Sequence, residues 1–182
     1  YLEWKEDVDN ARGFINKDNL LDYHIARTCS KKRLLDIIHN FIVFDAGVKK
    51  TCRHNQYFGI QAVKEHIARR EGGIIWHTQG SGKSLTMVWL AKWIRENVKD
   101  ARVLVITDRT ELDEQIEKVF KGVDEEIYRT DSGADLIGTL NETNPWLICS
   151  LVHKFGRRTD NEDNVATEEF IRDLKNNLPS DF

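Results

Sequence analysis

Residues 72–87 of the 182-residue chain read GGIIWHTQGSGKSLTM, and the stretch that decides the fold is HTQGSGKS at 77–84. A short β-branched run at 74–76 precedes it, and apolar residues recur at helical spacing from 83 to 98. A glycine-rich turn between a strand and a helix is the context in which phosphate-binding loops occur. Gly80 and Gly82 let successive backbone N–H groups face a common centre beside the positive end of a helix. The stretch therefore predicts a P-loop inside an α/β domain.

The chemistry of this loop suits the triphosphate of a nucleotide, although a chance glycine turn is the alternative. We expect the Lys83 ammonium to lie near the β and γ phosphates and the Ser84 hydroxyl to bind Mg²⁺. The strict P-loop pattern has glycine at the position of His77, for which a packed role and a catalytic role both stay open. The predicted catalytic residues are Lys83 and Ser84, the predicted metal ligand is Ser84, and the predicted nucleotide contacts in the loop are Gln79, Gly80, Ser81, Gly82, Lys83 and Ser84.

Strand-like and helix-like segments alternate beyond residue 100. The apolar run at 103–106 is typical of a strand buried on both faces of a parallel sheet. A helix is expected from Thr110, with Asp113 as a weak capping box. Short strands are expected at 127–128 and 146–150, a helix at 136–140, a polar loop at 156–164 and a last helix at 167–175. With helices predicted at 31–43 and 56–70, the fold class is α/β with a parallel sheet and a helical lead-in.

Composition narrows the function classes. The 27 basic and 30 acidic side chains give a net charge of −3, so any nucleic-acid contact must come from local geometry rather than from overall attraction. No apolar run approaches the roughly 20 residues that cross a bilayer, which excludes an integral membrane protein. The cysteines at 29, 52 and 149 are odd in number and far apart, which favours reduced thiols in the cytoplasm. The chain begins with Tyr1 and is expected to be part of a longer polypeptide.

Residues 72–87 resemble the nucleotide-binding signature of the restriction (R) subunit of type I restriction enzymes, within helicase superfamily 2. The WHTQ lead-in and the LTM continuation make this resemblance more specific than the glycine loop alone. Upstream, RHNQYF at 53–58 is similar to the glutamine motif of that family. The resemblance implies that the Gln56 amide pairs with the adenine edge, which an amide can do because it offers a donor and an acceptor. Gln61 is the alternative reader of the base, and a solvated helix start is the other interpretation.

Two downstream segments are also similar to the family. VITDRTELDEQ at 105–115 resembles motif Ia, whose loop lies along a nucleic-acid strand. The resemblance implies that Arg109 pairs with a phosphate and that Thr110 adds a neutral contact, while a solvated Asp108–Arg109 turn is the alternative. CSLVHKF at 149–155 stands where a later family segment occurs, so Ser150 and Lys154 are weaker candidates for DNA contact.

The resemblance implies a partial RecA-like lobe of a double-stranded DNA translocase that uses ATP and Mg²⁺. The full-length subunit would be an ATP-hydrolysing type I site-specific deoxyribonuclease that works with specificity and methyltransferase subunits. Residues 1–50 are predicted as a lead-in from a preceding nuclease domain, and residues 51–182 as the first part of the motor lobe, ending before the Walker B motif.

The family's nuclease residues, its Asp-Glu-x-His motif and its arginine finger are not identifiable in the sequence. We therefore expect nucleotide binding without efficient hydrolysis by this segment alone, since phosphoryl transfer needs more than a phosphate cradle. The alternatives are another P-loop NTPase, such as a different superfamily 2 helicase, a nucleotide kinase or a GTPase, and a non-catalytic docking segment. For docking, Phe41→Asp is the expected discriminating change.

Overall fold

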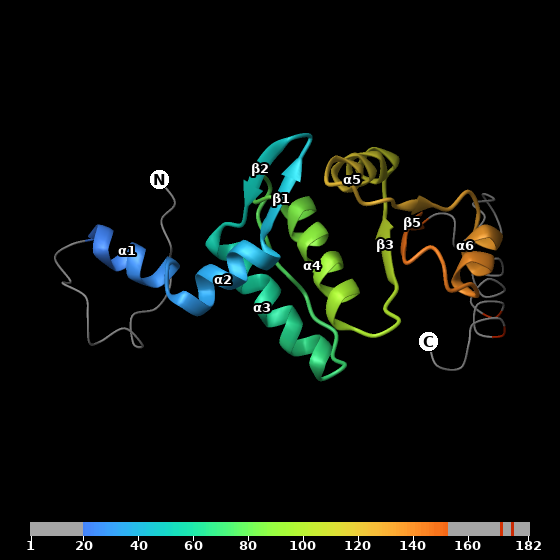
Figure 1. Cartoon of the computed structure of the whole chain (residues 1–182). Coiled ribbons are helices and arrows are strands. Elements are labelled where there is room, and N and C mark those ends of the chain that lie inside the picture. The colour runs from blue at the N-terminus through green and yellow to red at the C-terminus, as the bar shows by residue number, and fades with distance from the viewer. Residues whose placement is uncertain (1–19, 153–171, 173–175, 177–182) are drawn as a thin grey trace. The chain divides into compact units, whose positions relative to one another are not determined.

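The computed structural model describes residues 20–152, 172 and 176. The chain divides into two compact units, residues 1–90 and 91–182 (Figure 1). The predicted domain boundary after residue 50 stays a prediction. The described elements are α1 (Leu20–Thr28), α2 (Lys31–Asn40), β1 (Ile42–Asp45), β2 (Val48–Thr51), α3 (His54–Ala68), α4 (Lys83–Asn97), β3 (Val103–Thr107), α5 (Thr110–Gly122), β4 (Tyr128–Arg129), α6 (Gly133–Leu140) and β5 (Leu147–Leu151).

A β-hairpin follows α2 in the first unit. The helix predicted to reach Val43 ends at Asn40, and β1 pairs antiparallel with β2. Ala46 and Gly47 form the turn with φ of 49° and 78°. Two positive φ angles in a two-residue turn match the twist of the strands that it joins. The predicted helix end is therefore wrong, because the β-branched run after Asn40 favours a strand and Gly47 serves the hairpin turn.

An aromatic cluster forms the core of the first unit. Phe41 is fully buried, and its ring centroid lies 5.0 Å from that of Tyr57 in α3 and 6.1 Å from that of Trp89 in α4. Ile60 and Val88 are also buried. Aromatic side chains bury large apolar areas, so this cluster is a main source of stability for the unit. Phe41 is thereby a core residue and not a surface anchor.

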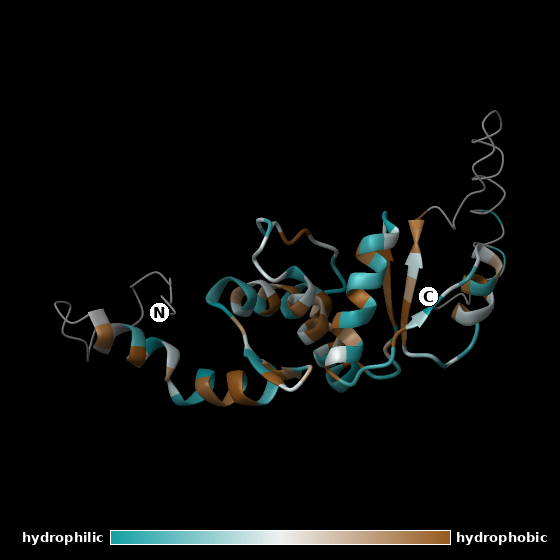
Figure 2. Cartoon of the chain, turned by 90° about the horizontal axis from the view of Figure 1, so that it is seen from above, coloured by the Kyte–Doolittle hydropathy of each residue, from teal (hydrophilic) through white to brown (hydrophobic). Residues whose placement is uncertain are grey.

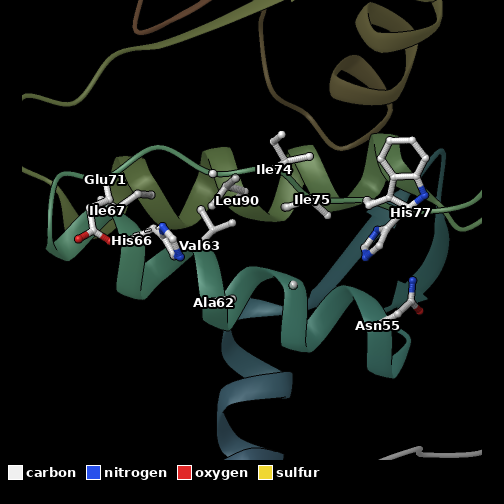
Figure 3. A pocket seen from close by; sticks show the side chains of 13 residues that line it. Asn55, Ala62, Val63, His66, Ile67, Glu71, Ile74, Ile75, His77 and Leu90 are labelled. Atoms are coloured by element: carbon white, nitrogen blue, oxygen red, sulfur yellow. Dashed lines mark ion pairs between the residues drawn. The ribbon is translucent and has the colours of Figure 1, made fainter.

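The strand predicted at 74–76 does not form. Residues 71–78 lie outside any helix or strand in this structure, and Ile74 and Trp76 are each 90% exposed. The prediction is wrong here because strand propensity reflects packing on a half-buried sheet, and this segment pairs with no strand in the described residues. The segment instead borders a groove of about 550 Å³, whose opposite wall includes Val63 and Ile67 of α3 (Figure 3).

The second unit contains the predicted parallel sheet, in the order β3-β5-β4. All five residues of the central strand β5 are buried, as expected of a strand covered on both faces. Val103 pairs with Leu147 and Thr107 with Leu151 along the β3–β5 ladder. The predicted strands at 103–106, 127–128 and 146–150 agree with the structure to within one residue at each end.

Helices α5 and α6 cover opposite faces of this sheet (Figure 1). Ile148 of β5 packs against Leu136 and Leu140 of α6, while the next residue, Cys149, contacts Asp113 of α5. Successive strand residues point to opposite faces, which places the two helices on either side. This arrangement agrees with the right-handed crossovers that are usual in parallel sheets, because the connections through α5 and α6 run in opposite directions along the sheet.

The three cysteines differ in their exposure. All three cysteines are free; Cys29 is exposed, whereas Cys52 and Cys149 are buried. Burial raises the pKa of the Cys52 thiol to about 12. The cytoplasmic location inferred from these thiols stays a prediction. In the part of the chain that the structure describes, no helix combines the length and apolar character needed to cross a bilayer. The loop predicted at 156–164 and, apart from Arg172, the helix predicted at 167–175 lie outside the described residues.

Candidate functional site

The glycine-rich loop leads directly into α4, which begins at Lys83. Gly80 and Gly82 have φ of 76° and 81°, a region that side chains disfavour. The Thr86 N–H donates to the Gly82 carbonyl at 3.1 Å, as the first bond of the helix. The amides of residues 82–85 therefore precede any helical acceptor. Together with the helix dipole, they give this end of α4 the character of an anion site.

The Lys83 side chain folds back over the loop. Its Nζ donates to the Thr78 carbonyl at 3.2 Å, and the Ser81 N–H donates to the same carbonyl at 3.3 Å. Lys83 is exposed, so an anion can compete for its ammonium group. Gln79 is exposed and Ser84, the second residue of α4, is half-buried. Ser81 is buried, and its Oγ has no hydrogen-bond partner in the described structure.

Gln56 belongs to the same site. It lies in the first turn of α3 and is 3% exposed. Its Oε1 accepts from the Arg53 N–H at 2.8 Å, and its Nε2 donates to the Gly82 carbonyl at 2.9 Å. Gln61, the other sequence candidate, donates instead to Asp36 of α2 at 2.7 Å. The structure thus joins Gln56 to the loop, and the adenine contact stays a prediction.

Two further residues shape the loop. The Thr86 Oγ1 donates to the Gly82 carbonyl at 3.2 Å, a contact that the sequence analysis missed. A threonine four residues after a helix-starting glycine is the signal that indicates such a back-bond. His77 lies against α3, where a Cβ on Gly59 would stand 3.5 Å from its ring (Figure 3). This placement favours the packed role of His77.

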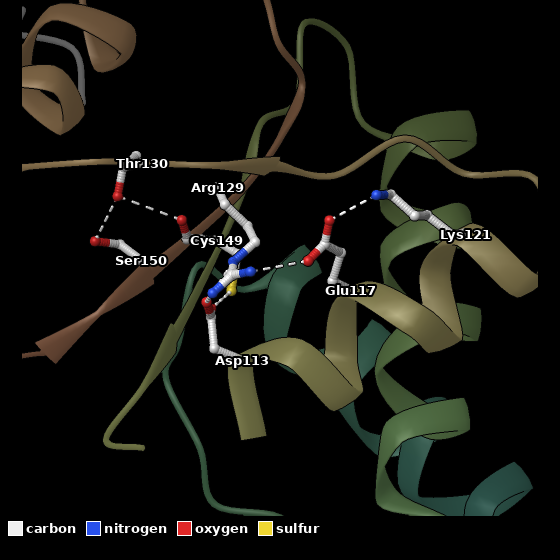
Figure 4. A network of polar contacts seen from close by, with 7 residues as sticks. All are labelled: Asp113, Glu117, Lys121, Arg129, Thr130, Cys149 and Ser150. Atoms are coloured by element: carbon white, nitrogen blue, oxygen red, sulfur yellow. Dashed lines mark hydrogen bonds and ion pairs between the residues drawn. The ribbon is translucent and has the colours of Figure 1, made fainter. Parts of the chain in front are cut away.

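The candidate DNA residues lie in the second unit. Arg109 is the N-cap of α5, after the carboxyl end of β3; its side chain is 73% exposed, with its Nε 3.5 Å from an Asp108 carboxylate oxygen. Thr110 is exposed at the start of α5. Ser150 is buried in β5 and accepts a hydrogen bond from the Thr130 hydroxyl at 2.9 Å (Figure 4). A DNA contact by Ser150 stays a prediction and would require that hydroxyl to leave its buried bond. Lys154 lies outside the described residues.

A partly buried polar cluster ties α5 to the sheet (Figure 4). Asp113 accepts hydrogen bonds from Arg129 of β4 and from the Cys149 thiol of β5, each at 2.6 Å. Arg129 also donates to Glu117 at 3.0 Å. A hydrogen bond from Lys121 lowers the pKa of Glu117. Asp113 was expected to form a capping box, but its carboxylate faces the sheet instead, so that expectation is wrong.

The chain is similar to known proteins over the region that contains this site. A model of the SWI2/SNF2 ATPase family matches residues 55–177. A putative type I restriction enzyme endonuclease subunit, MjaIXP, of Methanocaldococcus jannaschii is 31% identical over an alignment of 154 residues that covers 78% of this chain and 15% of that protein. The HindI endonuclease subunit of Haemophilus influenzae is 31% identical over an alignment of 152 residues that covers 75% of this chain and 14% of that protein.

A type I restriction enzyme endonuclease subunit of Staphylococcus saprophyticus is 25% identical over an alignment of 177 residues that covers 92% of this chain and 18% of that protein. The chain therefore spans less than a fifth of the length of these relatives. The similarity covers the loop, α4 and the parallel sheet of the second unit.

Proposed function

The chain belongs to the SWI2/SNF2 ATPase family and is a homologue of type I restriction endonuclease subunits, and from this premise we propose that it binds the triphosphate of ATP at the loop of residues 77–84. In this proposal it forms part of the first RecA-like lobe of a double-stranded DNA translocase. The family is an ATPase family, which gives no support to the nucleotide kinase or GTPase alternatives. Specificity and methyltransferase subunits are the proposed partners.

The arrangement around Lys83 carries the proposal. Its exposed ammonium lies over the loop, on the Thr78 carbonyl, at the start of a 15-residue helix whose first amides have no helical acceptor. A Cβ on Gly80 would meet nothing within 4 Å, so the glycine is required by the positive φ at this position and not by a close neighbour. Open space is therefore left beside the loop. These features fit a polyanion, which Lys83 would hold together with the amides of α4.

Ser84 is the proposed Mg²⁺ ligand, and Gln56 the proposed adenine contact. The ion would neutralise phosphate charge, while Lys83 and the helix amides would orient the phosphates. Arg109 and Thr110 are proposed to contact the DNA backbone, because an exposed cation beside a helix N-terminus suits a phosphate. We further propose that this segment alone binds nucleotide without turning it over efficiently.

Titration of the chain with ATP and Mg²⁺ tests the proposal. Lys83→Ala should weaken binding at least tenfold, because a charge-assisted contact contributes about 1.5–3 kcal/mol. Lys99→Ala is the matched control, since that lysine is 92% exposed beyond the far end of α4 and should leave binding unchanged. Equal affinities of the wild-type chain and Lys83→Ala would overturn the assignment.

Helix α2 supports a second candidate function, docking onto another subunit. Leu34, Leu35 and Ile38 are exposed apolar residues of this helix. The cartoon coloured by hydropathy shows hydrophobic stretches in the helices that follow the N-terminus (Figure 2). Phe41→Asp would not test docking, because Phe41 is fully buried in the core. Ile38→Asp is the appropriate change. It should abolish binding to the methyltransferase–specificity assembly while ATP binding persists; unaffected assembly would exclude this face.

A further inference from the structure

The Arg129 guanidinium of β4 holds α5 at two points (Figure 4). Its Nε and Nη2 both lie 2.6 Å from one carboxylate oxygen of Asp113, and its Nη1 donates to Glu117 at 3.0 Å. Asp113 and Glu117 are four residues apart on α5, so they lie on one face of the helix. Two contacts along one face oppose rotation of α5 about its own axis, which a single contact would allow.

A neighbouring strand holds the same carboxylate. Cys149 of β5 is the register partner of Arg129, and its thiol donates to the other carboxylate oxygen of Asp113 at 2.6 Å. Asp113 is 1% exposed. A buried carboxylate that accepts on both oxygens keeps one geometry, because the loss of a partner would leave a desolvated charge uncompensated. The first part of α5 is thereby fixed to the edge of the sheet.

The candidate DNA contacts lie in the turn that Asp113 ends. The Asp113 N–H donates to the Arg109 carbonyl at 3.1 Å, as the first bond of α5. Arg109 is the N-cap, but its side chain makes no capping hydrogen bond and is 73% exposed. The backbone of Asp113 therefore holds the N-cap residue, while its side chain is held by the sheet. The position of Asp113 sets the direction in which the Arg109 side chain leaves the helix.

We propose that Arg129 is a positioning residue for the DNA contact of Arg109. By holding Asp113 and Glu117, it sets the rotation of the first turn of α5 and thereby the direction of the Arg109 side chain. The inference rests on the proposed contact of Arg109 with the DNA backbone. It goes beyond that contact by assigning a role to a residue of a separate strand, 16 positions after Asp113, that acts through α5.

The test measures the affinity of the full chain for a short DNA duplex at one fixed salt concentration. Arg129→Lys keeps the positive charge but lacks the planar fork that reaches both carboxylates. Arg109→Ala should weaken binding about tenfold, the effect of one charge-assisted contact. Arg129→Lys should weaken it about threefold, and the double variant should lose less than the product of the two factors, because both changes act on one contact.

Arg102→Lys is the matched control, because Arg102 forks onto a different helix of this unit. Its guanidinium donates to the carbonyls of Thr139 and Leu140 at the end of α6, each at 2.7 Å. Circular dichroism should show both arginine-to-lysine variants folded, with DNA affinity lowered only in Arg129→Lys. Cys149→Ala removes another donor to Asp113 without a change of charge. It should also lower DNA affinity, which keeps the inference testable if Arg129→Lys does not fold.

A spectroscopic readout separates positioning from general loss of structure. In ¹⁵N-edited spectra of the full chain, the amide resonances of Thr110 and Glu111 should shift in Arg129→Lys and not in Arg102→Lys. Unchanged DNA affinity in Arg129→Lys would overturn the inference, as would single losses that multiply in the double variant. A wild-type chain that does not bind the duplex, or an unchanged affinity in Arg109→Ala, would instead refute the proposed DNA contact, and the inference with it.

Discussion

Removing the Arg129 guanidinium should destabilise the second unit more than neutralising the Asp113 carboxylate that it contacts. Asp113 is 1% exposed, and its oxygens accept hydrogen bonds at 2.6 Å from Arg129 and from the Cys149 thiol. The Arg129 side chain is 32% exposed and has a second partner, Glu117, at 3.0 Å. Removal of Arg129 therefore leaves Asp113 with the Cys149 thiol, whereas neutralisation of Asp113 leaves Arg129 with Glu117 and solvent.

The structure sets the expected magnitudes. Arg129→Met leaves a buried carboxylate with only a thiol donor, which is weak. Breaking a buried pair in this way costs about 3–5 kcal/mol, and we expect about 3 because the arginine end of the pair is open to water. Asp113→Asn leaves Arg129 with Glu117 and solvent, at a cost of about 1–2 kcal/mol. The double variant removes the uncompensated charge, so it should be more stable than Arg129→Met alone.

Urea denaturation at pH 7, followed by circular dichroism, measures these differences as shifts in midpoint at constant slope. The thermal midpoint should fall by about 2–4 °C for each kcal/mol lost. Lys121→Ala is the control, because it removes only the exposed partner of Glu117 and should change stability by less than about 1 kcal/mol. A double variant whose loss equals the sum of the single losses would refute the reasoning, as would a larger loss for Asp113→Asn than for Arg129→Met.

Three further predictions follow from burial and charge. Maleimide at pH 8 should label the exposed Cys29 rapidly and Cys52 only after unfolding, because Cys52 is buried and its pKa of about 12 keeps it protonated as a thiol. Equal labelling rates of the two cysteines in the folded chain would contradict this. Phe41→Asp should lower the thermal midpoint sharply or prevent folding, since an unpaired charge would replace a fully buried ring; a native-like midpoint would disprove its core role. The Lys121 hydrogen bond lowers the pKa of Glu117, so the stabilisation by the ionised Glu117 is present above its unfolded-state pKa and is lost as the pH falls through its folded-state pKa. In an acid titration, the stability advantage of the wild-type chain over Glu117→Gln should therefore shrink. An advantage that stays constant would contradict this role of Glu117.

Much of the fold is predictable because it depends on local patterns. The apolar run from Val103 needs only its own sequence to indicate a strand buried on both faces, and the P-loop needs only its glycines, Lys83 and the following helix. The hairpin at Gly47 is hard to predict because apolar residues recur from Leu34 to Phe44, across the end of α2 and the start of β1, so the helical and strand periodicities are not clearly separated. The strand at Ile74 was overpredicted because propensity says nothing about whether a neighbouring strand is present.

Candidate binding residues are harder to assign, because a polar residue type shows which bond it can make but not whether that bond is already made. Ser150 and Gln56 both read as ligand contacts, yet each is buried, and a buried polar group normally has a partner. Their partners, Thr130 and Gly82, lie 20 and 26 positions away, beyond the reach of any local pattern. Arg109 differs because its side chain is 73% exposed, and within the described residues its ion pair is with the neighbouring Asp108 at 3.5 Å. Burial therefore ranks the candidates in a way that sequence cannot, and it favours Arg109 over the buried Ser150 for DNA contact.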